Sequence, residues 1–291
     1  MGAGGSQGWD VTAWADHLGG LSLPLKADSR GALEALEARR GNTVAPREYA
    51  DLLLDDPLFA LMLLKRANEW APKHFRHDIT TPLGVVLTVG AVEVRRLLET
   101  APLVTGFNFG FLNFDRKATL AARLALAWGE LRVDIDPREL ALGVLLANAG
   151  ELLLWVFAPE LPRAALEYRL IRPEATDAQA EQAVCGFAFQ ELTLALGERW
   201  NLPELTLDLI RGEKHRRAQV ARVTVATVGY LARGLDDPGL ARSVLQAAGF
   251  MGVSAQEAIA GLPVLDAEQQ AELLRQALLL ASSAPETAGT H

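Results

Sequence analysis

An apolar helix is encoded by the segment Asp56-Pro57-Leu58-Phe59-Ala60-Leu61-Met62-Leu63-Leu64-Lys65-Arg66-Ala67-Asn68. An aspartate before a proline is typical of a helix start, because the carboxylate accepts hydrogen bonds from unpaired backbone N–H groups and proline has no N–H to lose. Large apolar side chains then follow on most sides of the predicted helix. We therefore expect it to be buried and central to the N-terminal half.

Helical patterns continue on both sides of this segment. Half of the 291 residues are hydrophobic, and Leu, Ala, Glu and Arg dominate without alternating runs of Val, Ile, Tyr and Thr. This composition favours helices by propensity and by period, so we predict an all-α fold. Further helices are predicted at 10–19, 29–41, 46–54, 82–90, 92–98, 116–129, 137–157, 161–171, 175–185, 189–200, 203–214, 218–233, 238–248, 254–260 and 267–282.

Four phenylalanines alternate with small and polar residues at Phe107, Phe109, Phe111 and Phe114. Their period of two could indicate a strand. A strand without a partner leaves its backbone groups unpaired, so a linker or a helix extension is the better interpretation.

The sequence favours a cytoplasmic protein without a membrane span. The only cysteine, Cys185, excludes an intrachain disulfide and the usual Cys-rich zinc sites. Residues 1–8 are rich in glycine and lack the charged and apolar regions of a secretory signal, so we expect a flexible leader. The most apolar stretch, residues 140–158, contains Asn148 and Glu151. Because an ionised glutamate is costly in lipid, we predict a buried core helix there.

A formal net charge of −8 works against general nucleic-acid binding, which depends on clustered cations. The local exception is the run Lys214-His215-Arg216-Arg217. Such a run is most often a solvated face or part of a helix end, and phosphate contact is the less common alternative.

Other catalytic or cofactor signals are weak. His74, His77 and Asp78 form the only histidine cluster, but Pro72 precedes it and indicates a surface loop rather than a metal site. The sequence contains no G-x-S-x-G nucleophile motif and no Gly-rich phosphate loop followed by Lys and Ser or Thr. We predict no cofactor and no metal.

Two blocks of sequence resemble the HDOD family, a relative of the HD-type metal phosphohydrolases. The first runs from Asp56-Pro57 to Ala67-Asn68 and on to Ile79-Thr80-Thr81 and Gly90. The second contains Glu181, Gly186 and the run from Glu198 to Pro203. The motif residues with expected structural roles are Asp56, Pro57, Asn68, Gly90, Trp200 and Pro203. For Asn68 we expect hydrogen bonds to the backbone of the turn at 69–73, in preference to contact with a partner.

The resemblance implies an HD-like helical bundle in two closely packed subdomains. Residues 1–20 would form the leader and a first short helix, and residues 21–112 an N-terminal HDOD-type subdomain. Residues 113–260 would form a degenerate HD-like subdomain, followed by a C-terminal helix and tail at 261–291.

In HD phosphohydrolases, His and Asp side chains hold metal ions that activate a water for attack on phosphate. The resemblance implies that these ligands are replaced here by Lys117, Ala147, Asn148 and Phe189. A methyl group cannot ligate a metal, and a neutral amide is a poor substitute for a carboxylate. The implied protein is therefore not an enzyme.

The function implied by the resemblance is that of a bacterial signal-transduction protein that acts by binding another protein. One alternative is a residual metal-dependent phosphohydrolase. Another is a nucleotide sensor in which cations converge on the vacated metal pocket and hold a phosphate. The candidate phosphate contacts are Arg116, Lys117, Lys214, His215, Arg216 and Arg217.

Overall fold

The computed structural model describes residues 8–41, 44–70, 79–105 and 109–283. Within these ranges the chain forms 17 helices and no strand, and it is 75% helical, which confirms the all-α prediction. The only β-type pairing among these described residues is an isolated parallel bridge between Leu25 and Leu103. The helices are α1 (Val11–Gly20), α2 (Ala27–Arg40), α3 (Pro46–Leu54), α4 (Pro57–Trp70), α5 (Pro82–Val89), α6 (Ala91–Thr100), α7 (Phe109–Gly129), α8 (Pro137–Leu145), α9 (Ala149–Phe157), α10 (Glu160–Ile171), α11 (Asp177–Cys185), α12 (Phe189–Trp200), α13 (Glu204–Arg211), α14 (Arg216–Leu231), α15 (Pro238–Met251), α16 (Ala255–Ala260) and α17 (Ala267–Ser283).

Some predictions fall outside the described residues. They concern Phe107, the loop with His74, His77 and Asp78, most of the N-terminal leader, and the C-terminal tail.

Side-chain caps start several helices where the sequence places them. The Asp10 carboxylate accepts from the backbone N–H of Ala13 at 2.8 Å and begins α1. The Thr81 hydroxyl accepts from Gly84 N at 3.2 Å, next to the proline that opens α5. These bonds satisfy N–H groups that have no partner inside the helix, which is why such starts can be read from sequence.

Helix α7 begins earlier than its apolar period indicates. It starts at Phe109 rather than at Arg116, so Phe109, Phe111 and Phe114 lie in its first two turns. This confirms the helix-extension interpretation of these residues. Phe111 is buried whereas Phe109 is exposed, so these two side chains do not share one face as alternate residues of a strand would.

The prediction of one helix over 137–157 is wrong. The chain breaks into α8 and α9, which are bent by 41° around residues 146–148. Asn148 has a non-helical backbone at φ −123° and ψ 37°, and the backbone N–H of Gly150 donates to Thr193 Oγ1 at 3.0 Å. The bend therefore directs the start of α9 onto α12.

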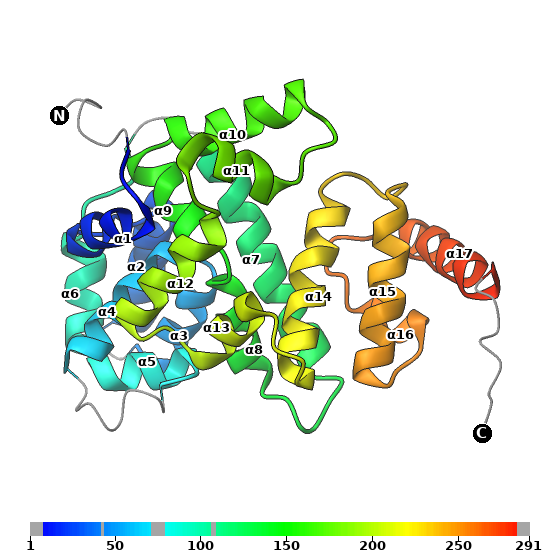
Figure 1. Cartoon of the computed structure of the whole chain (residues 1–291). Coiled ribbons are helices and arrows are strands. Elements are labelled where there is room, and N and C mark those ends of the chain that lie inside the picture. The colour runs from blue at the N-terminus through cyan, green and yellow to red at the C-terminus, as the bar shows by residue number, and fades with distance from the viewer. Residues whose placement is uncertain (1–7, 42–43, 71–78, 106–108, 284–291) are drawn as a thin grey trace.

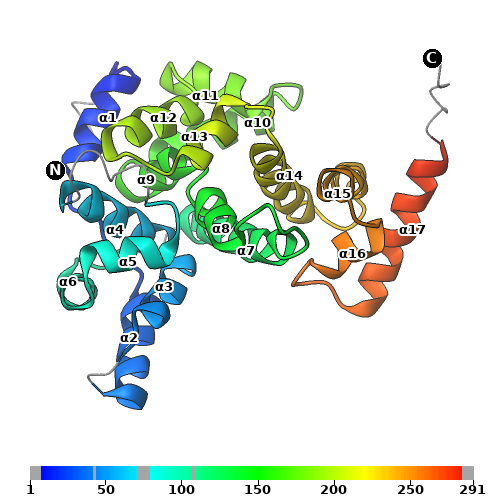
Figure 2. The same cartoon turned by 90° about the horizontal axis from the view of Figure 1, so that it is seen from below.

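Helices α1 to α6 gather at one end of the molecule and α15 to α17 at the other, with α7 and α8 between them (Figure 1). Helix α14 packs on α7 and α8 and carries α15, on which α16 and α17 lie. Helices α10 and α11 pack against each other at the edge of the molecule, beside α14 (Figure 2). One cluster of buried apolar side chains runs through the described residues from Trp14 to Ala277.

No single helix among the described residues has the length and apolar character needed to cross a membrane. The bent pair α8 and α9 passes that test by length and composition only when the two helices are taken together. In the structure both helices are largely buried in the core, as predicted for residues 140–158.

Candidate functional site

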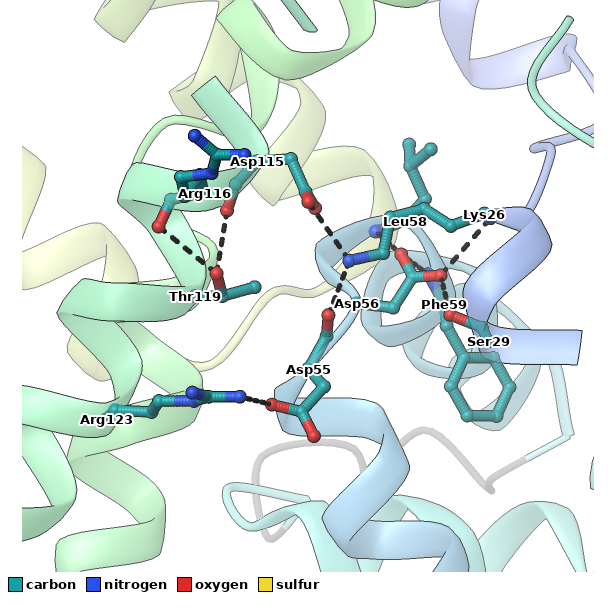
Figure 3. Close-up of polar contacts among 10 residues, drawn as sticks. All are labelled: Lys26, Ser29, Asp55, Asp56, Leu58, Phe59, Asp115, Arg116, Thr119 and Arg123. Carbon is teal, nitrogen blue, oxygen red and sulfur yellow. Dashed lines mark hydrogen bonds and ion pairs between the residues drawn. The ribbon is translucent and has the colours of Figure 1, made fainter. Parts of the chain in front are cut away.

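The Asp56 carboxylate is the centre of a buried polar network at the start of α4 (Figure 3). Its Oδ1 accepts from the backbone N–H groups of Leu58 at 2.9 Å and Phe59 at 3.1 Å. Its Oδ2 accepts from the Ser29 hydroxyl at 2.5 Å and from Lys26 N at 3.3 Å. The predicted cap is thus confirmed, and it also fastens the first turn of α2 to α4.

The Lys26 side chain extends this network to α7 (Figure 3). Its Nζ donates to the Asp55 carbonyl at 2.6 Å and to Asp115 Oδ2 at 3.0 Å. Burial raises the pKa of Asp115, and the charge of Lys26 opposes that rise. Lys26 therefore offsets only part of the cost of burying this carboxylate between helices.

Asn68 connects the two sequence blocks. Its amide nitrogen donates to the carbonyl oxygens of Trp200 at 2.6 Å and Asn201 at 3.0 Å. The amide nitrogen thus reaches across to the C-terminal end of α12, while residues 71–73 of the turn at 69–73, where its bonds were expected, lie outside the described residues. At that end of α12, Asn201 adopts a left-handed backbone at φ 49°, and the helix-end carbonyls lack partners within the helix.

The other motif residues act at helix boundaries. Gly90 lies between α5 and α6 with a φ of 81°, a conformation that favours glycine. Pro203 is buried and precedes α13. Trp200 is also buried, and the Lys65 ammonium lies 5.6 Å from its ring centroid. These roles are structural, as the sequence predicts.

A groove of about 650 Å³ lies between α7, α9, α10, α11, α12 and α14, and we call it the interhelical groove. Apolar side chains such as Phe114, Phe189 and Val228 form much of its wall. Its charged lining residues are Lys117, Glu151, Arg169, Asp177, Glu181 and Arg233. A concave surface that combines apolar side chains with converging polar groups is a common form of ligand site.

Glu151 is the most perturbed acid in the groove. Burial raises its pKa to about 7, and the nearby charge of Glu181 adds to the rise. The Trp155 indole N–H donates to Glu151 Oε1 at 3.2 Å, and this bond, together with the charge of Lys117, acts in the opposite direction. A carboxyl group with such a pKa changes charge near neutral pH.

Glu181 is a second half-buried carboxylate of the groove. Its Oε2 accepts from the backbone N–H of Phe189 at 2.7 Å, and burial raises its pKa despite that bond. No ion pair joins Glu151 or Glu181 to a cationic side chain within the part of the chain that the structure describes. Both acids therefore lie in the groove without a paired positive charge.

A family model for the HDOD domain matches residues 28–216. The chain belongs to the HDOD family. Its fold is similar to that of a virulence factor from Campylobacter jejuni, with a TM-score of 0.72 and 17% identity, covering 91% of this chain and 99% of that chain. The MmoQ response regulator from Methylococcus capsulatus gives a TM-score of 0.64 at 22% identity, covering 84% of this chain and 98% of that one. No curated protein matches the chain.

Three of the four residues implied to replace metal ligands line the interhelical groove of this HDOD protein. They are Lys117, Asn148 and Phe189. Ala147 is buried beside them and does not line the groove. Among the described residues, no group of three or more His, Cys, Asp or Glu side chains is placed to hold a metal ion.

The candidate phosphate contacts do not come together. Lys117 lines the groove, whereas Arg116 does not, and the basic run lies at the opposite end of α14 from the turns that line it. There His215 Nε2 lies 2.8 Å from Asp208 Oδ2, and Arg217 pairs with Glu139 at 3.1 Å. His215 also accepts from Ala218 N at 3.3 Å, so it caps α14.

Sequence reasoning missed the site roles of Glu151, Lys26 and Asp115. Glu151 could have been noticed in the sequence, because glutamate is rarely buried and this one lies in the most apolar stretch. Lys26 and Asp115 had no such signal, since they are 89 residues apart and their contact depends on how α7 packs beside the start of α2.

Proposed function

We propose that this HDOD protein is a non-catalytic regulatory protein of bacterial signal transduction that works in the cytoplasm by binding another protein. The observation that carries the proposal is the lining of the interhelical groove. It presents an ammonium group, an amide and a phenyl ring at Lys117, Asn148 and Phe189, where the family resemblance places metal ligands. None of these groups as placed offers the imidazole or carboxylate donors that HD hydrolysis needs.

The relatives support a regulatory role at the level of their names. One is called a response regulator and another a virulence factor. Because their identity with this chain is below 25%, the shared fold makes such a role plausible without specifying the pathway.

Exposed apolar side chains of α10 support a role in protein binding. Leu166, Leu170 and Ile171 are 51%, 81% and 80% exposed, and Leu166 also lines the interhelical groove. Burying such side chains against a signalling protein would contribute roughly 1–3 kcal/mol each.

The non-catalytic part of the proposal is tested by elemental analysis of purified protein and by phosphodiesterase and phosphatase assays with Mn²⁺, Mg²⁺, Fe²⁺ or Zn²⁺. We expect no bound metal near one equivalent and no hydrolysis above buffer. One equivalent of metal, together with hydrolysis that is lost on chelation, would overturn it.

The binding part is tested by affinity capture from the native cell with quantitative mass spectrometry. We expect Leu170→Asp to reduce capture of a specific partner at least tenfold, because a buried apolar contact is replaced by a charge. Val133→Asp is the matched control, since Val133 is fully exposed in the α7–α8 connection. Equal capture by wild type and both variants would contradict a role for α10.

A further inference from the structure

The interhelical groove combines an apolar wall with acids that have no positive counterpart. Glu151 and Glu181 are both half-buried, and each accepts only one N–H hydrogen bond from the described residues. Carboxylates in such surroundings are normally paired, because an isolated charge is expensive to remove from water. Burial raises the pKa of both carboxyl groups, and a cation bound in the groove would stabilise their ionised forms.

The cations that line the groove do not fill that role. Arg169 is engaged by Asp177, and Arg233 pairs with Asp237 at 2.6 Å, outside the groove lining. Lys117 is exposed at the groove, and its charge acts on Glu151 without a hydrogen bond between them. The half-buried part of the groove is therefore acidic, and its exposed part is basic.

We propose that the interhelical groove binds a small organic cation with an apolar body, whose ammonium group is held by Glu151 and Glu181. The apolar body packs against Phe114, Phe189 and Val228. A volume of about 650 Å³ accommodates a molecule of this class. The proposal concerns ligand binding and does not depend on the regulatory function proposed above.

Charge separates this ligand from the nucleotide considered on sequence grounds. Among the described residues that line the groove, Lys117 is the cation without an ion-pair partner, and a phosphate there would also lie near the carboxylates of Glu151, Asp177 and Glu181. An ammonium group would instead be attracted by these carboxylates. Its charge-assisted hydrogen bonds to them are among the stronger polar contacts in proteins.

Binding of the cation depends on pH through Glu151. The charged groups that face it across the groove are Lys117 from α7, Arg169 from α10, Asp177 and Glu181 from α11, and Arg233 after α14. Because burial raises the pKa of Glu151 to about 7, its carboxyl group is mostly neutral at pH 6 and mostly ionised at pH 8. An alkylammonium group stays protonated over this range, so its affinity increases as the pH rises.

The test uses the full chain and two probes of similar shape and opposite charge, phenethylamine and 3-phenylpropionate, measured by calorimetry and thermal shift at pH 8. We expect the amine to bind and the acid not to bind. Glu151→Gln should weaken the amine roughly ten- to hundredfold, as expected for a charged hydrogen bond of about 1.5–3 kcal/mol. Glu160→Gln, an exposed acid of α10 outside the groove, is the control and should bind as wild type does.

The Lys117→Ala variant tests whether the groove prefers a cationic or an anionic ligand. Removal of this cation should strengthen amine binding a few-fold, whereas it would weaken an anion. The proposal is overturned if neither probe binds, if 3-phenylpropionate or a cyclic dinucleotide binds and Lys117→Ala abolishes that binding, or if Glu151→Gln leaves the amine affinity unchanged.

Discussion

At the scale of single residues, Asp56 accepts four hydrogen bonds while it is fully buried. Asp56→Ala should reduce the free energy of unfolding by about 3–5 kcal/mol, because it removes a helix cap and leaves buried donors unpaired. Urea unfolding monitored by circular dichroism measures this loss.

The neighbouring acid provides the control for this prediction. Asp55 pairs with Arg123 at 3.0 Å on the surface, where both side chains are mostly exposed. Asp55→Ala should therefore cost less than about 1 kcal/mol. Similar small losses for both variants would show that the buried network at Asp56 contributes little to stability.

Glu151 makes the stability of the protein depend on pH. Its pKa is about 7 in the folded protein and near the usual 4.5 in the unfolded chain, so the unfolded state releases its proton first as the pH rises. Glu151 therefore reduces stability progressively between about pH 4.5 and 7, and the penalty is constant above that range.

Glu151→Gln should remove this penalty. The variant should match the wild type at pH 4 and exceed it by about 1–3 kcal/mol at pH 8, since one pKa unit corresponds to roughly 1.4 kcal/mol. Urea unfolding at a series of pH values checks the prediction. A stability difference that does not change with pH would exclude a raised pKa for Glu151.

Residue-level signals predicted caps well and long-range contacts poorly. Asp56 could be identified as a cap because its partners are two and three residues away. Asn68 could not be assigned to Trp200, because 132 residues separate them and only the tertiary packing of α4 near α12 brings them together. The groove could not be predicted for the same reason, since five separate segments of the chain supply its charged groups.

At the scale of elements, the break between α8 and α9 is the feature that the apolar pattern concealed. Residues 137–157 read as one helix because every turn carries apolar side chains. Helices α8 and α9 are separated where α9 approaches α12 closely. A Cβ on Gly150 would lie 2.8 Å from Phe189 O and from Thr193 N. The apolar pattern shows which residues are buried. It does not show how closely a second helix approaches the backbone, and that approach breaks the helix here.

Gly150→Ala should therefore destabilise the protein although alanine favours helices. The added methyl group meets backbone atoms that cannot move without shifting α12, and we expect a loss of about 2–4 kcal/mol. Gly249→Ala in α15 is the control, because a Cβ there meets nothing within 4 Å and should stabilise by about 0.5–1 kcal/mol. The midpoint of thermal denaturation should fall for Gly150→Ala and rise for Gly249→Ala.

At the scale of the whole molecule, the HDOD match ends at residue 216, and α14 to α17 extend the fold beyond it. The division into subdomains at residues 112 and 260 stays a prediction, because the buried cluster runs across both positions. Helix α14 nevertheless matters to the candidate site, since Val225, Val228 and Gly229 complete the wall of the interhelical groove.

Trp128 fastens this C-terminal extension to the HDOD core. It is fully buried at the end of α7, and its indole N–H donates to the Ala258 carbonyl in α16 at 2.9 Å. Gly261 lies so close that a Cβ there would be 2.9 Å from the indole ring. Trp128→Phe would remove the hydrogen bond, leave the Ala258 carbonyl unpaired and loosen this contact.

We expect Trp128→Phe to make the amides of α16 exchange with solvent roughly tenfold faster, because a lost hydrogen bond of about 1–1.5 kcal/mol promotes local opening. The amides of α4, at the other end of the molecule, should keep their exchange rates. Hydrogen–deuterium exchange with mass spectrometry measures both regions at once, and Trp70→Phe serves as the control because Trp70 is half exposed. Equal acceleration in α4 and α16 would mean that the extension opens only together with the HDOD core.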